Sequence, residues 1–217
     1  MTAIDDAALR GYYDRRAAGY EQIYHPRDDG HGRELGELAR ELREAVRDRS
    51  VLEVACGTGY WTAAAASVAR SVTATDSSLA MLAVAREKLF PASVRLLEAD
   101  AYDLDALGER FQAALAMFWV SHVPRARLRA FLRGLHRRLE PGAVVFLADN
   151  VHLPGLGGEL VGPDAAGNTY KARALADGSR HRVLKNYFRE AELRDLLGPA
   201  AQVRFGSCFW SARYFLP

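Results

Sequence analysis

The stretch of residues 51–61, VLEVACGTGYW, decides the fold class of this chain of 217 residues. It opens with a short apolar run, residues 51–55, which is typical of a buried strand. Gly57 and Gly59 then form a turn, and residues 60–69 are compatible with a helix. A strand, a glycine turn and a helix make the first unit of an open parallel sheet. Such a turn lets a ligand approach the backbone, and the helix N-terminus offers unpaired N–H groups to it.

Carboxylates stand at the ends of the next predicted strands. Residues 71–75 form a second strand that ends in Asp76, and residues 94–97 form a third that leads to Asp100. An acid at the end of the strand beside the glycine turn can accept hydrogen bonds from both ribose hydroxyls of a nucleoside. Asp100, one strand further out, could reach an adenine amino group. A fourth strand, residues 113–117, is followed by the segment 118–122, FWVSH.

Taken in this order, these features resemble the class I S-adenosylmethionine-dependent methyltransferases, specifically the small bacterial type that acts on small molecules. The resemblance covers residues 10–150 well and includes the turn at Pro141-Gly142 before a fifth strand, residues 143–148. It implies a Rossmann-like α/β fold, with a seven-stranded, mostly parallel sheet and an antiparallel last strand. It also implies N-terminal lid helices and a β-hairpin flap, all within one domain over residues 1–217.

The resemblance further implies S-adenosylmethionine as the cofactor and places residues around it. The family's first motif, an acid and three alternating glycines, has alanine at the first glycine here, and we expect binding to survive that change. The expected cofactor contacts are the motif residues Glu53, Ala55, Gly57, Thr58 and Gly59, then Trp61, Asp76 and Ser77, Met81, Asp100 and Ala101, and Phe118. Met81 matches the position that packs on adenine, although an ordinary core role stays open, and Trp61 could pack on the cofactor or on the lid.

The N-terminal segment is the expected lid. Residues 7–24 look helical and place Tyr13, Tyr20 and Tyr24 on one face. Residues 12–21 are similar to the family's lid, in which tyrosines and arginines close over the amino-acid end of the cofactor, so Tyr13 and Tyr20 are expected there. Packing of a plain amphipathic helix onto the core is the alternative. A second helix over residues 33–47 is expected to cover the sheet, so that residues 1–47 form the lid and cover helices.

His122 is the predicted catalytic residue. Methyl transfer is an in-line displacement, and proximity and orientation can supply about 7–11 kcal/mol of the barrier reduction. A phenol or amine nucleophile also benefits from a general base, and His122 is the candidate near the reactive methyl. The alternative is that His122 only positions ligands at the strand end.

The region after the fifth strand is expected to lie on the substrate side. A loop rich in glycine and proline, residues 151–168, precedes two strands, residues 169–175 and 180–188, joined by the hairpin signal at 176–179. The segment 151–188 therefore predicts a loop and a β-flap over the pocket. Asp149, at the end of the fifth strand, is expected to line the substrate pocket. A bound metal is not expected, because Met117 and Phe118 stand where metal-dependent methyltransferases need a carboxylate.

A third segment, from Pro124 to Leu139, predicts a helix whose outer face carries six arginines. We interpret that face as solvated, with binding of an acidic partner or substrate tail as the alternative. Two strands near the end, residues 203–205 and 209–215, are expected to pair antiparallel.

Composition and missing motifs narrow the function classes. The net charge of +2 gives no argument for nucleic acid, and neither the Asn/Asp-Pro-Pro-Tyr/Phe motif nor a Pro-Cys nucleophile is found. No apolar run approaches the length of a membrane span, and the first residues, 1–6, do not have the basic-then-apolar pattern of a signal peptide. We therefore expect a cytoplasmic protein that acts on a small-molecule acceptor and has no membrane partner. The aromatic content favours an aromatic or apolar acceptor. A nicotinamide oxidoreductase is disfavoured by Thr62 at the third glycine position, whereas a non-catalytic S-adenosylmethionine-binding regulator stays open.

Overall fold

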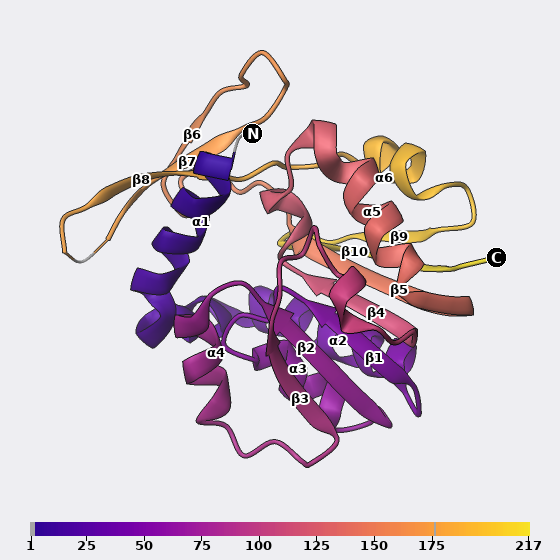
Figure 1. The fold of residues 1–217 in the computed structure, drawn as a ribbon. Helices are drawn as coiled ribbons and strands as arrows, with labels where there is room; N and C mark the ends of the chain where they lie inside the picture. The colour runs from indigo at the N-terminus through magenta and orange to yellow at the C-terminus, as the bar shows by residue number, and fades with distance from the viewer. Residues whose placement is uncertain (1–2, 176) are drawn as a thin grey trace.

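The computed structural model describes residues 3–175 and 177–217. Its main feature is a seven-stranded sheet in the order β3-β2-β1-β4-β5-β10-β9 (Figure 1). The strands are β1 (Ser50–Val54), β2 (Ser71–Asp76), β3 (Val94–Glu98), β4 (Phe111–Met117), β5 (Leu139–Asn150), β9 (Gln202–Phe205) and β10 (Phe209–Phe215). The pairings among β1 to β5 are parallel, and β10 is antiparallel to both β5 and β9. The predicted fold class, including the antiparallel last strand, is confirmed.

Helices cover both faces of this sheet and form two apolar cores. On one face lie α2 (Asp29–Val46) and α3 (Tyr60–Ala66), and on the other lie α5 (Leu128–Arg137) and α6 (Glu190–Leu197). Leu38 and Leu42 of α2, spaced one turn apart, are fully buried, as is Leu135 of α5. This i, i+4 spacing gives α2 one apolar stripe that faces the sheet. Because helices cover both faces of the sheet, the central strands are nearly continuous apolar runs.

The N-terminal segment differs from the prediction of one helix over residues 7–24. It consists of α1 (Ala3–Arg16) followed by a 3₁₀ helix, η1 (Ala17–Tyr24). Gly19 lies in the second part, where its low helix propensity weakens continuation of the wider α-helical turn. α1 runs along the side of the molecule, between α4 (Leu79–Arg86) and a second, smaller sheet (Figure 1).

The segment between β4 and β5 also differs in detail. The helix predicted from Pro124 to Leu139 begins as a 3₁₀ turn, η4 (Arg125–Arg127), and α5 proper ends at Arg137. The predicted turn at residues 140–142 lies inside β5, where the ladder with β4 shifts its register between Phe111 and Ala113. Gly142 absorbs this irregularity with a positive φ of 75°. Two further 3₁₀ turns are η2 (Asp105–Leu107) and η3 (Val120–His122).

The smaller sheet, which we call the flap, has three antiparallel strands. They are β6 (Glu159–Val161), β7 (Tyr170–Ala174) and β8 (Arg180–Leu184) in the order β6-β7-β8. The predicted hairpin corresponds to β7 and β8, and β6 comes from the segment that sequence reasoning treated as a loop. Ala176, in the predicted turn, lies outside the described residues. Among the described residues, no helix combines the length and apolar character needed to cross a membrane.

Candidate active site

A cavity of about 550 Å³ opens at the carboxyl edge of the parallel strands, beneath α1 and η1. Its walls come from the ends of β1, β2, β3 and β4 and from the N-terminal segment. Its volume falls in the range of roughly 300–1,000 Å³ that is typical of small-molecule sites, and the carboxyl edge of an open α/β sheet is where ligands bind. In the described part of the chain, no group of three or more His, Cys, Asp or Glu side chains is placed to hold a metal ion.

Most of the predicted site residues meet in this cavity. Those that line it are Tyr13, Tyr20, Glu53, Ala55, Gly57, Trp61, Asp76, Ser77, Met81, Asp100, Ala101, Phe118 and His122. Sequence reasoning missed other lining residues, among them Cys56, Glu98, Tyr102 and Trp119. Their common signal is position, because each lies within a few residues of the carboxyl end of a strand.

Thr58 and Gly59 do not line the cavity, unlike their motif neighbours. The Thr58 hydroxyl donates a hydrogen bond to Oε1 of Glu21, at 2.8 Å, and so ties the glycine loop to η1. Gly59 begins α3 with a φ of 78°, and a Cβ there would lie 3.0 Å from Cζ of Phe90. These two residues therefore shape the loop and its packing, and the ligand-facing surface is left to Gly57 and Ala55.

Asp76 is held in place by the backbone of the loop beside it. The N–H of Gly57 donates to Oδ2 and the N–H of Ser78 to Oδ1, both at 2.8 Å. Burial raises the pKa of Asp76, although these backbone N–H groups oppose the rise. The Ser78 hydroxyl also caps α4 by accepting from the N–H of Met81, whose side chain lines the cavity.

Ala55 occupies a conformation that favours glycine. Its φ is +56°, as is that of Gly57 two residues later, and Phe118, after the neighbouring strand β4, has a φ of +58°. A left-handed backbone costs a residue with a Cβ about 1–2 kcal/mol. Strain of this kind is concentrated at functional sites, where the surrounding structure holds it in place.

Glu53 is a buried acid at the floor of the cavity. It is 1% exposed and accepts a hydrogen bond of 2.6 Å from the hydroxyl of Thr62. Burial raises the pKa of Glu53 to about 8, and the hydrogen bond from Thr62 opposes that rise. A cationic ligand in the cavity would favour the carboxylate form of Glu53.

Tyr13 and His122 meet at the other end of the cavity. Nδ1 of His122 lies 2.6 Å from the carbonyl oxygen of Leu184, which can only accept, so Nδ1 carries the proton. Nε2 is then the acceptor for the Tyr13 hydroxyl, 2.8 Å away. Burial, followed by the nearby charge of Lys185, lowers the pKa of His122 to about 3, so the imidazole is neutral at physiological pH.

Asp149 does not line the cavity, contrary to the prediction. It is fully buried and pairs with Nζ of Lys185 at 2.9 Å, and it accepts from the N–H of Ser121 at 2.9 Å. Burial alone would raise the pKa of Asp149, but the Lys185 charge outweighs it and holds the pKa below its usual value. Nζ of Lys185 also donates to the Ser121 hydroxyl at 2.7 Å. The pair therefore clamps the segment that carries His122, a role that no sequence motif signals.

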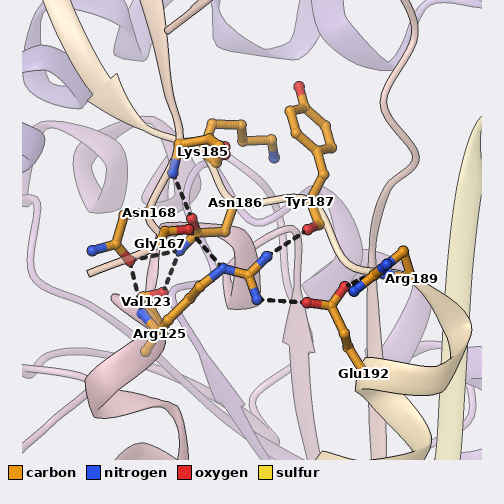
Figure 2. Close-up of polar contacts among 10 residues, drawn as sticks. Val123, Arg125, Gly167, Asn168, Lys185, Asn186, Tyr187, Arg189 and Glu192 are labelled. Carbon is orange, nitrogen blue, oxygen red and sulfur yellow. Dashed lines mark hydrogen bonds and ion pairs between the residues drawn. The ribbon is translucent and has the colours of Figure 1, made fainter. Parts of the chain in front are cut away.

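The arginine face of the predicted helix is solvated only in part. Arg125 donates to the carbonyls of Gly167 and Tyr187 and pairs with Glu192, at 2.9, 3.0 and 2.8 Å (Figure 2). In the same cluster, Asn186 is fully buried and donates to the carbonyl of Val123. Side-chain contacts thus join η4, just before α5, to the loop before β7, to the segment after β8 and to α6.

A second arginine of that face holds the lid. Arg127 pairs with Asp6 of α1 at 2.8 Å and lies 3.4 Å from the centroid of the Tyr102 ring. The predicted solvated face is therefore wrong for Arg125 and Arg127. Sequence spacing alone could not separate these two from Arg133, which is exposed.

The strand order, the glycine loop and the carboxylate at the end of β2 together define a Rossmann-like, class I methyltransferase fold. Comparison with known proteins agrees. A family described as "Methyltransferase domain" matches residues 51–142, from β1 into the start of β5. Residues 51–142 are therefore similar to this methyltransferase family, and the sheet around them has the class I methyltransferase fold.

Solved structures with the same fold include small-molecule methyltransferases. A structure described as a DhpI–SAH complex is 27% identical with a TM-score of 0.81, and the match covers 100% of both chains. The SAM-bound structure of CalS10, an amino pentose methyltransferase from Micromonospora echinaspora, is 25% identical with a TM-score of 0.60. That match covers 89% of this chain and 95% of CalS10.

Two curated relatives match over shorter stretches. Malonyl-[acyl-carrier protein] O-methyltransferase of Pectobacterium atrosepticum is 36% identical over 119 residues, and cypemycin N-terminal methyltransferase of Streptomyces sp is 32% identical over 101 residues. The matches cover 54% and 46% of this chain, and 44% and 41% of the relatives. The chain therefore spans less than half the length of these two relatives.

Proposed function

We propose that the protein transfers a methyl group from S-adenosylmethionine to an oxygen or nitrogen nucleophile of a small organic acceptor. The observation that carries this proposal is the position of Asp76, whose two oxygens are held by the N–H groups of Gly57 and Ser78 at the cavity wall. An acid fixed at this place suits a nucleoside ribose. The DhpI and CalS10 structures, named for complexes with SAH and SAM, support the same cofactor.

The residues of the cavity fit this cofactor along its length. Asp76 would accept hydrogen bonds from the ribose, and Asp100 and Met81 would lie at the adenine end. Glu53 and Tyr20 suit the amino-acid end, because a neutral tyrosine and a buried acid can bind an ammonium group. When bound, the cofactor supplies a methyl group made electrophilic by a sulfonium.

Tyr13 and His122 are the proposed catalytic pair. The low pKa of His122 keeps Nε2 unprotonated, so it orients the Tyr13 hydroxyl and leaves a phenol lone pair toward the cavity. An acceptor hydroxyl or amine that donates to the phenol oxygen would be held in line for attack. The rings of Phe118, Trp119 and Tyr13 line this end and would help to hold an acceptor in position.

The wider setting is also a proposal. We expect one methyltransferase domain over residues 1–217, with a lid at residues 1–47 and a substrate-side loop and flap at residues 151–188. The free thiols of Cys56 and Cys208 fit a reducing bacterial cytoplasm. The size of the cavity suits a small molecule, and no nucleic-acid or membrane partner enters the proposal.

Calorimetric titration with S-adenosylhomocysteine, and separately with NAD, tests this function. The wild type should bind S-adenosylhomocysteine, Asp76→Ala should bind it at least about tenfold more weakly, and Asp105→Ala should bind it normally. Asp105 is the matched control because its carboxylate pairs with Arg137 on the surface. Binding of NAD alone would overturn the proposal. Acceptor-dependent production of S-adenosylhomocysteine separates an enzyme from a non-catalytic binding protein.

A further inference from the structure

One face of the flap is turned toward α1. In the pairing of β7 with β8, Lys171 lies opposite Val183 and Arg173 opposite His181, so these four side chains share a face. Val183 packs in a buried cluster with Leu9 and Tyr12 of α1, and the centroid of the His181 ring lies 5.4 Å from that of Tyr12. Arg173 lies on this same face of the flap, which packs against α1; Figure 1 shows the flap beside α1.

Two lysines near this face already have partners. Nζ of Lys171 donates to the carbonyls of Leu156 and Gly158, at 3.1 and 2.9 Å. Nζ of Lys185 is occupied by Asp149 and by the Ser121 hydroxyl. Both lysines are at least 95% buried, and both serve to hold backbone and side chains in place.

Arg173 is different, because its guanidinium makes no hydrogen bond or ion pair with the described part of the chain, and its Nε is buried. Buried donors in native proteins nearly always have partners, so this guanidinium is available to a partner that the described residues do not supply. Gly157, in the segment before β6, lies next to this guanidinium, because a Cβ built on Gly157 would lie 3.0 Å from Nη1 of Arg173. Gly157 has a φ of 71°, a conformation that side chains rarely adopt, so its bare backbone packs closely against the guanidinium without supplying a side-chain partner.

The charge of Arg173 reaches the reactive end of the site. It opposes the rise in the pKa of Tyr13 and of Tyr187 that burial causes, and it adds to the lowering of the pKa of His122. Asp149 is the acid that faces this region, and Lys185 already neutralises it. The local balance is therefore positive beside the proposed catalytic pair.

We propose that Arg173 binds an anionic oxygen group, a carboxylate or a phosphate-like group, of the methyl acceptor. The planar guanidinium can donate two parallel hydrogen bonds to such a group, which would hold the acceptor between the flap and the Tyr13–His122 pair. This inference rests on the proposed function and deepens it, because it gives the acceptor a charge class. It also differs from the sequence-based expectation of an apolar acceptor.

The contacts that hold the β7–β8 hairpin in place support a binding role for Arg173. Arg125 and Asn186 link the segments that flank β7 and β8 to residues 123–125 (Figure 2). The Lys185–Asp149 pair, with its contacts to Ser121, adds a second link to the segment that carries His122. These contacts hold the base of the β7–β8 hairpin, from which Arg173 extends, against the segment that carries His122. Such pre-organisation is what an in-line displacement requires of its acceptor.

The test uses the protein saturated with S-adenosylhomocysteine and measures binding of inorganic phosphate and of acetate by change in thermal midpoint and by titration. Arg173→Gln is compared with Arg182→Gln, the matched control, since Arg182 stacks on Tyr170 at 3.7 Å on the other face of the same sheet. We expect the wild type and Arg182→Gln to bind at least one of the two anions, and Arg173→Gln to bind it about tenfold more weakly or not at all. S-adenosylhomocysteine should bind all three proteins equally.

A second readout uses turnover on small hydroxy acids and on their uncharged methyl esters. Wild type should prefer the acids, and Arg173→Gln should lose that preference through a rise in KM. Equal anion binding by Arg173→Gln and wild type, or no anion binding by wild type, overturns the inference. Weaker binding of S-adenosylhomocysteine by Arg173→Gln also overturns it, because Arg173 would then serve the cofactor carboxylate. Failure of wild type to bind S-adenosylhomocysteine at all refutes the proposed function instead.

Discussion

The hydroxyl of Tyr13 and Nε2 of His122 lie 2.8 Å apart, and their hydrogen bond joins the lid helix α1 to the segment after β4. Tyr13 is the donor and Nε2 the acceptor, because Nδ1 of His122 carries the proton and donates it to the carbonyl of Leu184 in the flap. One imidazole thus connects three parts of the chain that are remote in sequence. Movement of the lid away from the cavity must break this contact.

Tyr13→Phe should weaken the closed lid and reduce turnover. The variant leaves Nε2 of buried His122 without a donor, which costs about 1–3 kcal/mol of stability. Turnover should fall far more than affinity for S-adenosylhomocysteine, and His122→Ala should behave in the same way. Steady-state kinetics and calorimetry measure the two effects. Tyr12→Phe is the control, because the Tyr12 hydroxyl accepts from Arg16 and not from His122. Unchanged turnover in both Tyr13→Phe and His122→Ala would remove the pair from catalysis.

The pH dependence of stability should reveal the raised pKa of the buried Glu53 carboxyl. Its folded pKa of about 8 lies above the usual 4.5, so the folded protein keeps a proton that the unfolded chain releases. The folded state therefore loses stability relative to the unfolded state as pH rises from 4.5 toward 8. Glu53→Gln keeps an acceptor for Thr62 and has no proton to lose, so the thermal midpoint of the variant should rise relative to wild type across that interval. A constant difference in midpoint at every pH would show that Glu53 is ionised in the folded protein.

His122 should make the stability of the fold depend on pH in a lower range, and there the stability should rise with pH. Its folded pKa of about 3 lies below the usual 6.5, so the unfolded chain takes up a proton first as pH falls. Stability should decline from pH 6.5 toward 3, and His122→Gln should decline less steeply over the same range. Thermal unfolding in a pH series measures this. Equal slopes for the two proteins would indicate that the histidine titrates normally in the fold.

Ala55→Gly should stabilise the protein. The φ of +56° at Ala55 strains a residue with a Cβ, and relief of that strain is worth about 1 kcal/mol after the added flexibility of the unfolded chain is counted. Chemical denaturation measures the change. Ala63→Gly, at an exposed position of α3, is the control and should destabilise by about 1 kcal/mol. If both variants destabilise to the same extent, Ala55 is unstrained.

Arg125→Ala should loosen the flap while leaving the cofactor side intact. The change removes the contacts to Gly167, Tyr187 and Glu192, which link α5 to the substrate side. Hydrogen exchange should accelerate over residues 164–187, and turnover should fall, with little change in the affinity for S-adenosylhomocysteine. Arg133→Ala, an exposed arginine on α5, should change neither. Unaltered exchange in the flap would show that other contacts suffice to hold it.

Much of the cofactor half of the site follows from the sequence alone. Local rules place Gly57, Asp76 and Asp100 at the carboxyl ends of adjacent strands, because the residues before each one form short apolar runs and parallel strands end at the same edge. The order of glycine loop and acids then identifies the fold, and the structure confirms it. These features depend on neighbours within a few positions, which is why a pattern of residues can reveal them.

The acceptor half was decided only by tertiary structure. The Lys185–Asp149 pair spans 36 positions and the Tyr13–His122 bond spans 109, and nothing in the local sequence around either residue marks its partner. Arg125 is half-buried in a polar cluster while Arg133 is left in solvent, and that difference depends on which segments pack against η4 and α5. Charges and hydrogen bonds between remote segments take their energies from burial and distance, and those quantities exist only once the chain has folded.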